Sequence, residues 1–135
     1  TIQAVVARHL LEKINHITES RVAHADYFDK ELSSVSQIII PKRDSDIYQV
    51  YHIYSICCQR RSELQNYLIE NGVDAKVHYP ITMHLQPAAD YLGHKKGDFP
   101  IAETIADNTI SLPVHEFISR VQQEHVIKLI KAFYD

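Results

Sequence analysis

A chain of 135 residues with 45% hydrophobic and 23% charged side chains has the composition of an ordinary globular domain, long enough to bury one core. Its formal net charge of -3, with lysine and arginine scattered along the chain, argues against nucleic acid as a partner. No apolar run approaches the roughly 20 residues that span a bilayer and no signal peptide opens the chain, so we expect no membrane partner.

The first part of the chain predicts a long helix, because apolar residues recur at helical spacing from Ile2 to Leu32 without glycine or proline. The apolar stripe loses its phase near residues 18–20, where we expect a break between two collinear helices if the helix is not continuous. Helical periodicity is already present at Ile2, directly after Thr1, which predicts that the chain is a fragment of a longer protein.

Two stretches rich in β-branched and aromatic residues predict strands over residues 37–41 and 48–58. Pro41 ends the first strand and favours a place at the edge of a sheet. A helix is then predicted over residues 60–72, with Gly72 in the left-handed position beyond its last turn.

Residues 73–80 predict a further strand, and residues 81–98 predict a long irregular loop with one helical turn at 86–93. A loop of this length inside a compact domain is usually functional or disordered. The loop holds His84 and His94 among prolines and glycines, which makes it the first candidate for a site.

A helix is predicted over residues 99–109, opened by Asp98 and Pro100, and a short strand over 110–113. Ser119 begins a capping-box pattern for the final helix. The order α–β–β–α–β–α–β–α with short strands predicts an α/β domain of the α+β type. We expect a small mixed or antiparallel sheet with helices packed on one side.

The nine histidines raise the question of a metal site. No histidine shares the spacing of a zinc site with Cys57 or Cys58, so we expect no metal. The two cysteines are neighbours in a predicted buried strand, where their side chains point to opposite faces. We therefore expect neither a disulfide nor a reactive thiolate, and the cysteine usage favours a cytoplasmic location.

Five motifs follow one another along the chain: TIQAVVARHLLEKI, VYHIYSI, RSELQNYLIENGVDAKVHYP, HLQPAADYLGHKKGDFPIAE and ISLPVHEFIS. Together they resemble the C-terminal small domain of the DegT/DnrJ/EryC1/StrS family over essentially all of residues 1–135. Members of this family are sugar aminotransferases with the type I aminotransferase fold. The resemblance implies a parent enzyme that depends on pyridoxal phosphate (PLP) and transfers an amino group, usually from glutamate, to a nucleotide-linked keto sugar.

The resemblance also implies a division of labour between two domains. The lysine that binds PLP and the groups that hold its ring and phosphate belong to a large N-terminal domain that this chain does not contain. We therefore expect no catalytic residue in the chain and no PLP on the isolated fragment. The implied partners are the protein's own large domain, a second subunit in a homodimer, the nucleotide-linked sugar and the amino donor.

By the same resemblance, the chain completes the substrate pocket with His78, Tyr79, His84, Phe99 and, less directly, His52. Each of these side chains could instead serve only as packing at the edge of the core. Two other functions stay open: a PLP-dependent sugar dehydratase, in which histidine replaces the PLP-binding lysine, and a non-catalytic regulatory protein. The sugar also stays open, because several residues around the loop histidine depart from the family pattern.

Overall fold

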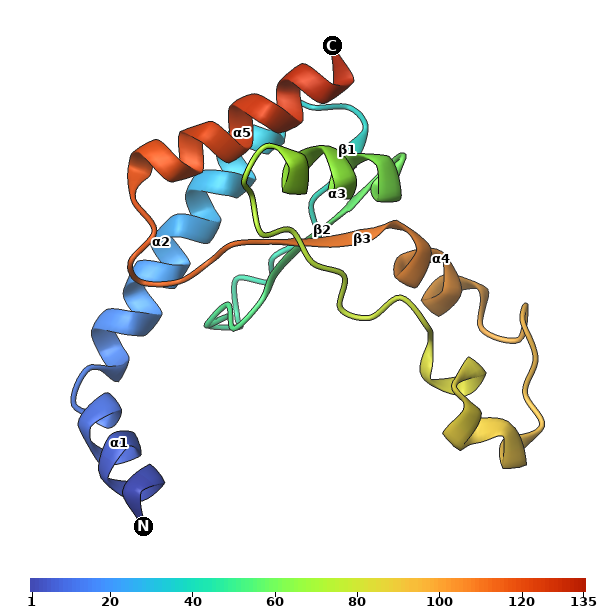
Figure 1. Cartoon of the computed structure of the whole chain (residues 1–135), viewed down its shortest axis with the longest axis horizontal. Coiled ribbons are helices and arrows are strands. Elements are labelled where there is room, and N and C mark those ends of the chain that lie inside the picture. The colour runs from blue at the N-terminus through green and yellow to red at the C-terminus, as the bar shows by residue number, and fades with distance from the viewer.

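A three-stranded antiparallel sheet with the order β1-β2-β3 forms the centre of the protein (Figure 1), whose computed structural model describes all residues 1–135. β1 (Ile38–Ile39) pairs with β2 (Tyr54–Cys58), and β2 pairs with β3 (Thr109–Leu112). The predicted α/β class with a small antiparallel sheet is confirmed. β1 is a short edge strand, as the nearby proline predicted.

The two faces of the sheet differ because side chains alternate along each strand. Tyr54, Ile56 and Cys58 of β2 point into the core and are at most 3% exposed. Ser55 and Cys57 point to the opposite face and are half-buried. One face of the sheet is therefore sealed by helices, and the other remains available to line clefts.

Three helices cover the sealed face: α2 (Ile14–Leu32), α3 (Arg61–Glu70) and α5 (Arg120–Tyr134). Phe28 of α2 stacks on Tyr54 of the sheet with ring centroids 5.2 Å apart. A fourth helix, α4 (Pro100–Asn108), lies outside this layer and leads directly into β3 (Figure 1).

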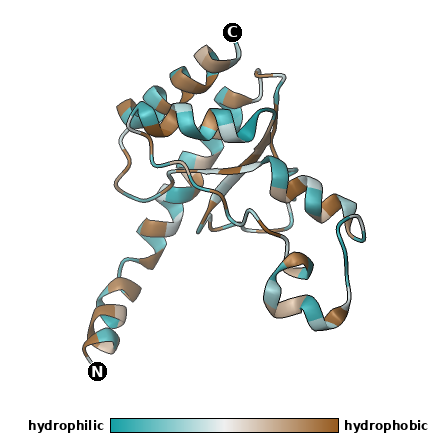
Figure 2. Ribbon diagram, turned by 45° about the vertical axis from the view of Figure 1, so that its right-hand side comes forward, coloured by the Kyte–Doolittle hydropathy of each residue, from teal (hydrophilic) through white to brown (hydrophobic).

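The predicted break near residues 18–20 is wrong. The helical segment is interrupted at Glu12 and Lys13, which separate α1 (Ile2–Leu11) from α2. α2 is held by packing of its second half on the core, whereas α1 has no buried residue and projects away from the body of the protein (Figure 1). Figure 2 shows apolar residues along this projecting helix.

Two predicted strands are shorter than the sequence pattern suggested. Residues 48–53 are not part of β2, because Tyr51 adopts a positive φ of 49° and turns its buried ring beneath the Arg43 guanidinium. Residues 73–80 form only one β-bridge, between Lys76 and Ser111. In both places no neighbouring strand supplies the hydrogen bonds that a regular strand needs.

The predicted helix ends are mostly confirmed. Gly72 has a φ of 81°, and the N–H groups of Gly72 and Val73 donate to the last turn of α3 in a Schellman cap. Ser119 forms the predicted capping box at the start of α5. Asp98 does not cap α4, since it accepts a hydrogen bond from the backbone of Lys95 within the preceding loop.

Candidate functional site

The segment between the Lys76 bridge and α4 leaves the sheet and forms an arm opposite α1 (Figure 1). It contains two short 3₁₀ helices, Met83–Leu85 and Pro87–Leu92, which confirm the helical turn expected in this loop. Between them and the start of α4 lies a pocket of about 420 Å³, which we call the loop pocket. Its lining residues are Met83, His84, Gln86, Ala88, Ala89, Tyr91, Leu92, His94 and Phe99.

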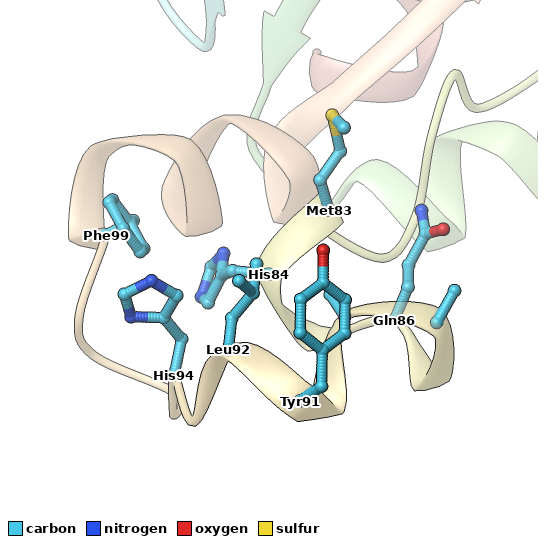
Figure 3. Close-up of a pocket in the computed structure, with 9 residues that line it drawn as sticks. Met83, His84, Gln86, Tyr91, Leu92, His94 and Phe99 are labelled. Atoms are coloured by element: carbon cyan, nitrogen blue, oxygen red, sulfur yellow. The ribbon is translucent and has the colours of Figure 1, made fainter.

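Three rings meet at one end of the loop pocket (Figure 3). The ring of Phe99 lies 4.8 Å from His84 and 5.0 Å from His94 between centroids. Tyr91 and Met83 are each 84% exposed, and they lie on the opposite side of the pocket from the ring of Phe99. The pocket thus combines an apolar wall with imidazole groups, as sites for small organic ligands commonly do.

The carboxylate of Glu103 in α4 fixes the back of this pocket. It lies 3.0 Å from Nε2 of His84, and both side chains are about 10% exposed, at 11% and 9%. The same carboxylate accepts backbone N–H groups from Gly97 at 2.8 and 2.9 Å and from Phe99 at 3.3 Å. The Gly97 N–H first, and then those of Phe99 and His84, hold the pKa of Glu103 below its ordinary value. One ring nitrogen of His84 is therefore already used inside the protein.

A second cleft lies at one end of the sheet, where the residues before β2, the end of β3 and the Lys76 bridge meet. It has a volume of about 240 Å³, and we call it the histidine cleft. Its polar lining is made of His52, Asp74, Lys76, His78, Ser111 and His115. Its apolar lining is made of Ile53, Leu112, Pro113 and Val114.

Hydroxyl groups of the sheet orient His78 in this cleft. Its Nδ1 lies 3.0 Å from the hydroxyl of Ser111, which lies 2.8 Å from the hydroxyl of Ser55 on the paired strand. The bridge between Lys76 and Ser111 holds the segment that carries His78 against the sheet. The register of β2 and β3 therefore sets the position of this imidazole.

The five predicted substrate-binding residues do not share one cavity. His84 and Phe99 line the loop pocket, while His52 and His78 line the histidine cleft. Tyr79 is 70% exposed, and its ring packs edge-on against that of His78 at 5.5 Å. It borders a shallow hollow with Pro80, Ile81, Gln86, Pro87 and Ala88.

Four residues of these sites were not singled out from the sequence: Glu103, Ser111, His115 and Lys76. His115 lies three residues beyond Leu112, the last residue of β3, and its place shortly after a predicted strand was a usable signal. Glu103 and Ser111 gave no such signal, because their partners are 19 and 33 residues away in sequence.

The cysteines lie in β2 as free thiols. Burial raises the pKa of both thiols, to about 11 for Cys58, so they remain protonated at neutral pH. No group of three or more histidine, cysteine, aspartate or glutamate side chains is placed to hold a metal ion. No helix of the protein combines the length and the apolar character needed to cross a membrane.

The residues present do not fit PLP as a cofactor held by this chain alone. PLP enzymes bind the cofactor through a desolvated lysine, with a charged partner for the pyridine nitrogen. None of the lysines here is buried, and Lys76 of the histidine cleft lies at its rim, 60% exposed and 3.0 Å from Asp74. The chain therefore has two clefts with imidazole groups but no lysine suited to bind PLP.

Comparison with known proteins gives relatives over the whole length. The erythromycin biosynthesis sensory transduction protein EryC1 of Saccharopolyspora erythraea is 34% identical over 131 residues, covering 97% of this chain and 36% of that protein. The dTDP-3-amino-3,4,6-trideoxy-alpha-D-glucose transaminase of Streptomyces venezuelae is 31% identical over 132 residues, covering 98% of this chain and 35% of the transaminase.

The fold has a solved counterpart. The crystal structure of S. venezuelae DesV in complex with a ketimine intermediate matches with a TM-score of 0.94 at 30% identity, over 98% of this chain and 36% of DesV. The chain thus spans little more than a third of the length of these relatives. The model of the DegT/DnrJ/EryC1/StrS aminotransferase family matches residues 1–131, and the chain belongs to this family.

Proposed function

We propose that the chain is the C-terminal small domain of a PLP-dependent aminotransferase that transfers an amino group, from glutamate, to a nucleotide-linked keto sugar. Family membership supports the aminotransferase activity. The name of the S. venezuelae relative, a transaminase for a dTDP-linked amino sugar, supports the class of substrate.

One observation carries the proposal. Two clefts open to the surface and present imidazole groups, yet no buried lysine lies in or near either of them. These clefts present groups that could contact a substrate, and the PLP-binding lysine would come from the large domain. When bound to the large domain, PLP would supply the electron sink for the transfer, and this chain would bind and orient the substrate.

The exposed apolar surface of the chain supports contacts with the large domain and a second subunit. The large apolar residues of α1 and the start of α2 are 47 to 82% exposed: Ile2, Val5, Val6, Leu10, Leu11 and Ile14. A further groove of about 630 Å³ lies between β1, β2 and α4 on the face of the sheet away from the core. Monomeric proteins rarely leave such surfaces bare. We assign them to contacts with the large domain and with a second subunit of a homodimer.

Within this assembly His78, Tyr79, His84, Phe99 and His52 would contact the substrate. Imidazole and phenol groups donate to sugar hydroxyl, keto and phosphate oxygens, and the Phe99 ring supplies apolar contact.

The experiment that tests the proposal uses the full-length protein loaded with PLP. We expect it to aminate a dTDP-linked keto sugar with glutamate as donor, measured as formation of the amino sugar by mass spectrometry. Loss of a hydroxyl group from the sugar without gain of nitrogen would show a dehydratase instead. Absence of turnover together with binding of the sugar would favour the regulatory alternative, which the name of the EryC1 relative raises.

A further inference from the structure

The histidine cleft presents hydrogen-bond donors, and His115 shows this most directly. The backbone N–H of Phe117 donates to its Nδ1 at 3.2 Å. Because a backbone nitrogen can only donate, Nδ1 holds the lone pair and the neutral ring carries its proton on Nε2. No protein group accepts a hydrogen bond from this Nε2, which leaves it for a ligand in the cleft.

The hydrogen bonds of His78 also favour the tautomer with the proton on Nε2. If the Ser55 hydroxyl donates to Ser111 and the Ser111 hydroxyl donates to Nδ1 of His78, both hydroxyl protons have acceptors. The opposite direction leaves the Ser55 proton without a protein acceptor. The first arrangement again places the proton of the neutral imidazole on Nε2, where no protein group accepts it.

Lys76 adds a positive charge at the rim. Its ammonium lies 3.0 Å from the carboxylate of Asp74, and the two side chains are 60% and 74% exposed. An ion pair this exposed is weak, so a carboxylate from a ligand can replace Asp74 as the partner of Lys76. His52 lines the cleft without any hydrogen bond inside the protein.

We propose that the histidine cleft binds a carboxylate group, held by the Nε2 protons of His78 and His115 and by the ammonium of Lys76. Donors without matching acceptors suit a ligand group that only accepts hydrogen bonds. The cleft, of about 240 Å³ in this chain alone, has room for the carboxylate end of a small acid. In the full-length enzyme this ligand is the amino donor, which would occupy the cleft in one half-reaction, while His78 and His52 would contact the nucleotide-linked sugar in the other. This identification rests on the proposed function, while the carboxylate site itself does not.

Binding is tested by calorimetry with glutarate and inorganic phosphate as separate probes on the full-length, PLP-free protein. We expect glutarate to bind, and His115→Ala to raise its Kd at least about tenfold, since a hydrogen bond to a charged group is lost. The matched control is His125→Ala, an exposed histidine on α5, which should leave the Kd unchanged. His115 is itself exposed, so its truncation does not open the core. An equal Kd in the His115 variant, or His115-dependent binding of phosphate alone, overturns the carboxylate site.

The identity of the ligand is tested by the two half-reactions of the PLP-loaded enzyme. We expect His115→Ala to raise the KM for glutamate about tenfold and to leave the KM for the nucleotide-linked sugar unchanged. The reverse pattern overturns the assignment to the amino donor. If the wild-type enzyme performs neither half-reaction, the proposed function fails, and the calorimetry still decides whether the cleft is a carboxylate site.

Discussion

Nε2 of His84 lies 3.0 Å from Oε1 of Glu103, and that carboxylate also receives two backbone N–H groups from the end of the loop. A single acidic side chain on α4 therefore fixes both the histidine in the loop pocket and the backbone that leads into the helix. The position of His84 depends on Glu103, so the roles of the two residues must be separated by paired variants.

Replacing His84 with alanine in the full-length enzyme should raise the KM for the nucleotide-linked sugar or lower kcat. Glu103→Gln keeps the imidazole and removes only the charge that holds it. If His84 contacts the substrate, His84→Ala should lower kcat/KM for the nucleotide-linked sugar more than Glu103→Gln does. Steady-state kinetics of both variants measure this difference. A His84→Ala rate equal to wild type at every substrate concentration would remove this residue from the site.

Order in residues 94–99 should depend on pH through Glu103. The pKa of Glu103 in the folded protein is held below its ordinary value of 4.5. The stabilisation that its carboxylate provides is therefore complete above pH 4.5 and is lost as the pH falls through the lower pKa of the folded protein. The protection factors of the Gly97 and Phe99 amides in the full-length protein should fall below pH 4.5, measured by hydrogen exchange corrected for the pH dependence of the intrinsic exchange rate. Asp98, whose pKa is lowered first by the Lys95 N–H, contributes in the same direction. In Glu103→Gln the remaining pH dependence belongs to Asp98, and an unchanged profile would contradict the prediction.

The partly buried cluster of Asp29, Arg43 and Tyr54 should be sensitive to loss of its acid. Asp29 accepts two hydrogen bonds from Arg43, at 2.9 and 3.0 Å, and one from the Tyr54 hydroxyl at 2.7 Å. Asp29→Ala leaves both donors unpaired and should cost about 2 kcal/mol, measured by native-state hydrogen exchange of α2. Tyr54→Phe removes one bond and should cost about 1 kcal/mol. Equal effects of the two variants would contradict this ordering.

Truncation in the core should be costlier than truncation at the surface. Phe28 is fully buried against Tyr54, so Phe28→Ala should lower the free energy of unfolding by about 3–5 kcal/mol. The control is Ile69→Ala on α3, at a position that is 51% exposed, with an expected cost below about 1 kcal/mol. Thermal unfolding of the full-length protein compares the two, and a similar change in Tm would place Phe28 outside the core.

The sequence predicted elements whose signals are local. The capping box at Ser119 and the left-handed Gly72 depend on residues within one turn, and both are present. The strand expected over residues 48–58 failed at its first half because Tyr51 is held by Arg43, a contact between side chains that alternation of apolar residues does not encode. The break at Lys13 had no glycine or proline to mark it, and it lies within a stretch without buried residues that runs from α1 into the first half of α2.

The candidate site also has features that the sequence could predict and features that it could not. The histidine-rich loop could be recognised from residue type and spacing, whereas the individual substrate-binding residues were named from the resemblance to the family. Their grouping into two clefts could not be named, because it depends on the β2–β3 register and on Glu103 reaching back across the loop.

Because the helix is interrupted at Glu12 and Lys13, α1 is not stabilised by continuity with α2. A ten-residue helix without packing is marginally stable in water, because the cost of nucleation is not repaid over so few turns. α2, anchored by its buried second half, has no such dependence. Helical content in residues 2–11 therefore acts as an internal reporter: it should be low whenever the apolar face of α1 is solvated and should rise when another surface covers it.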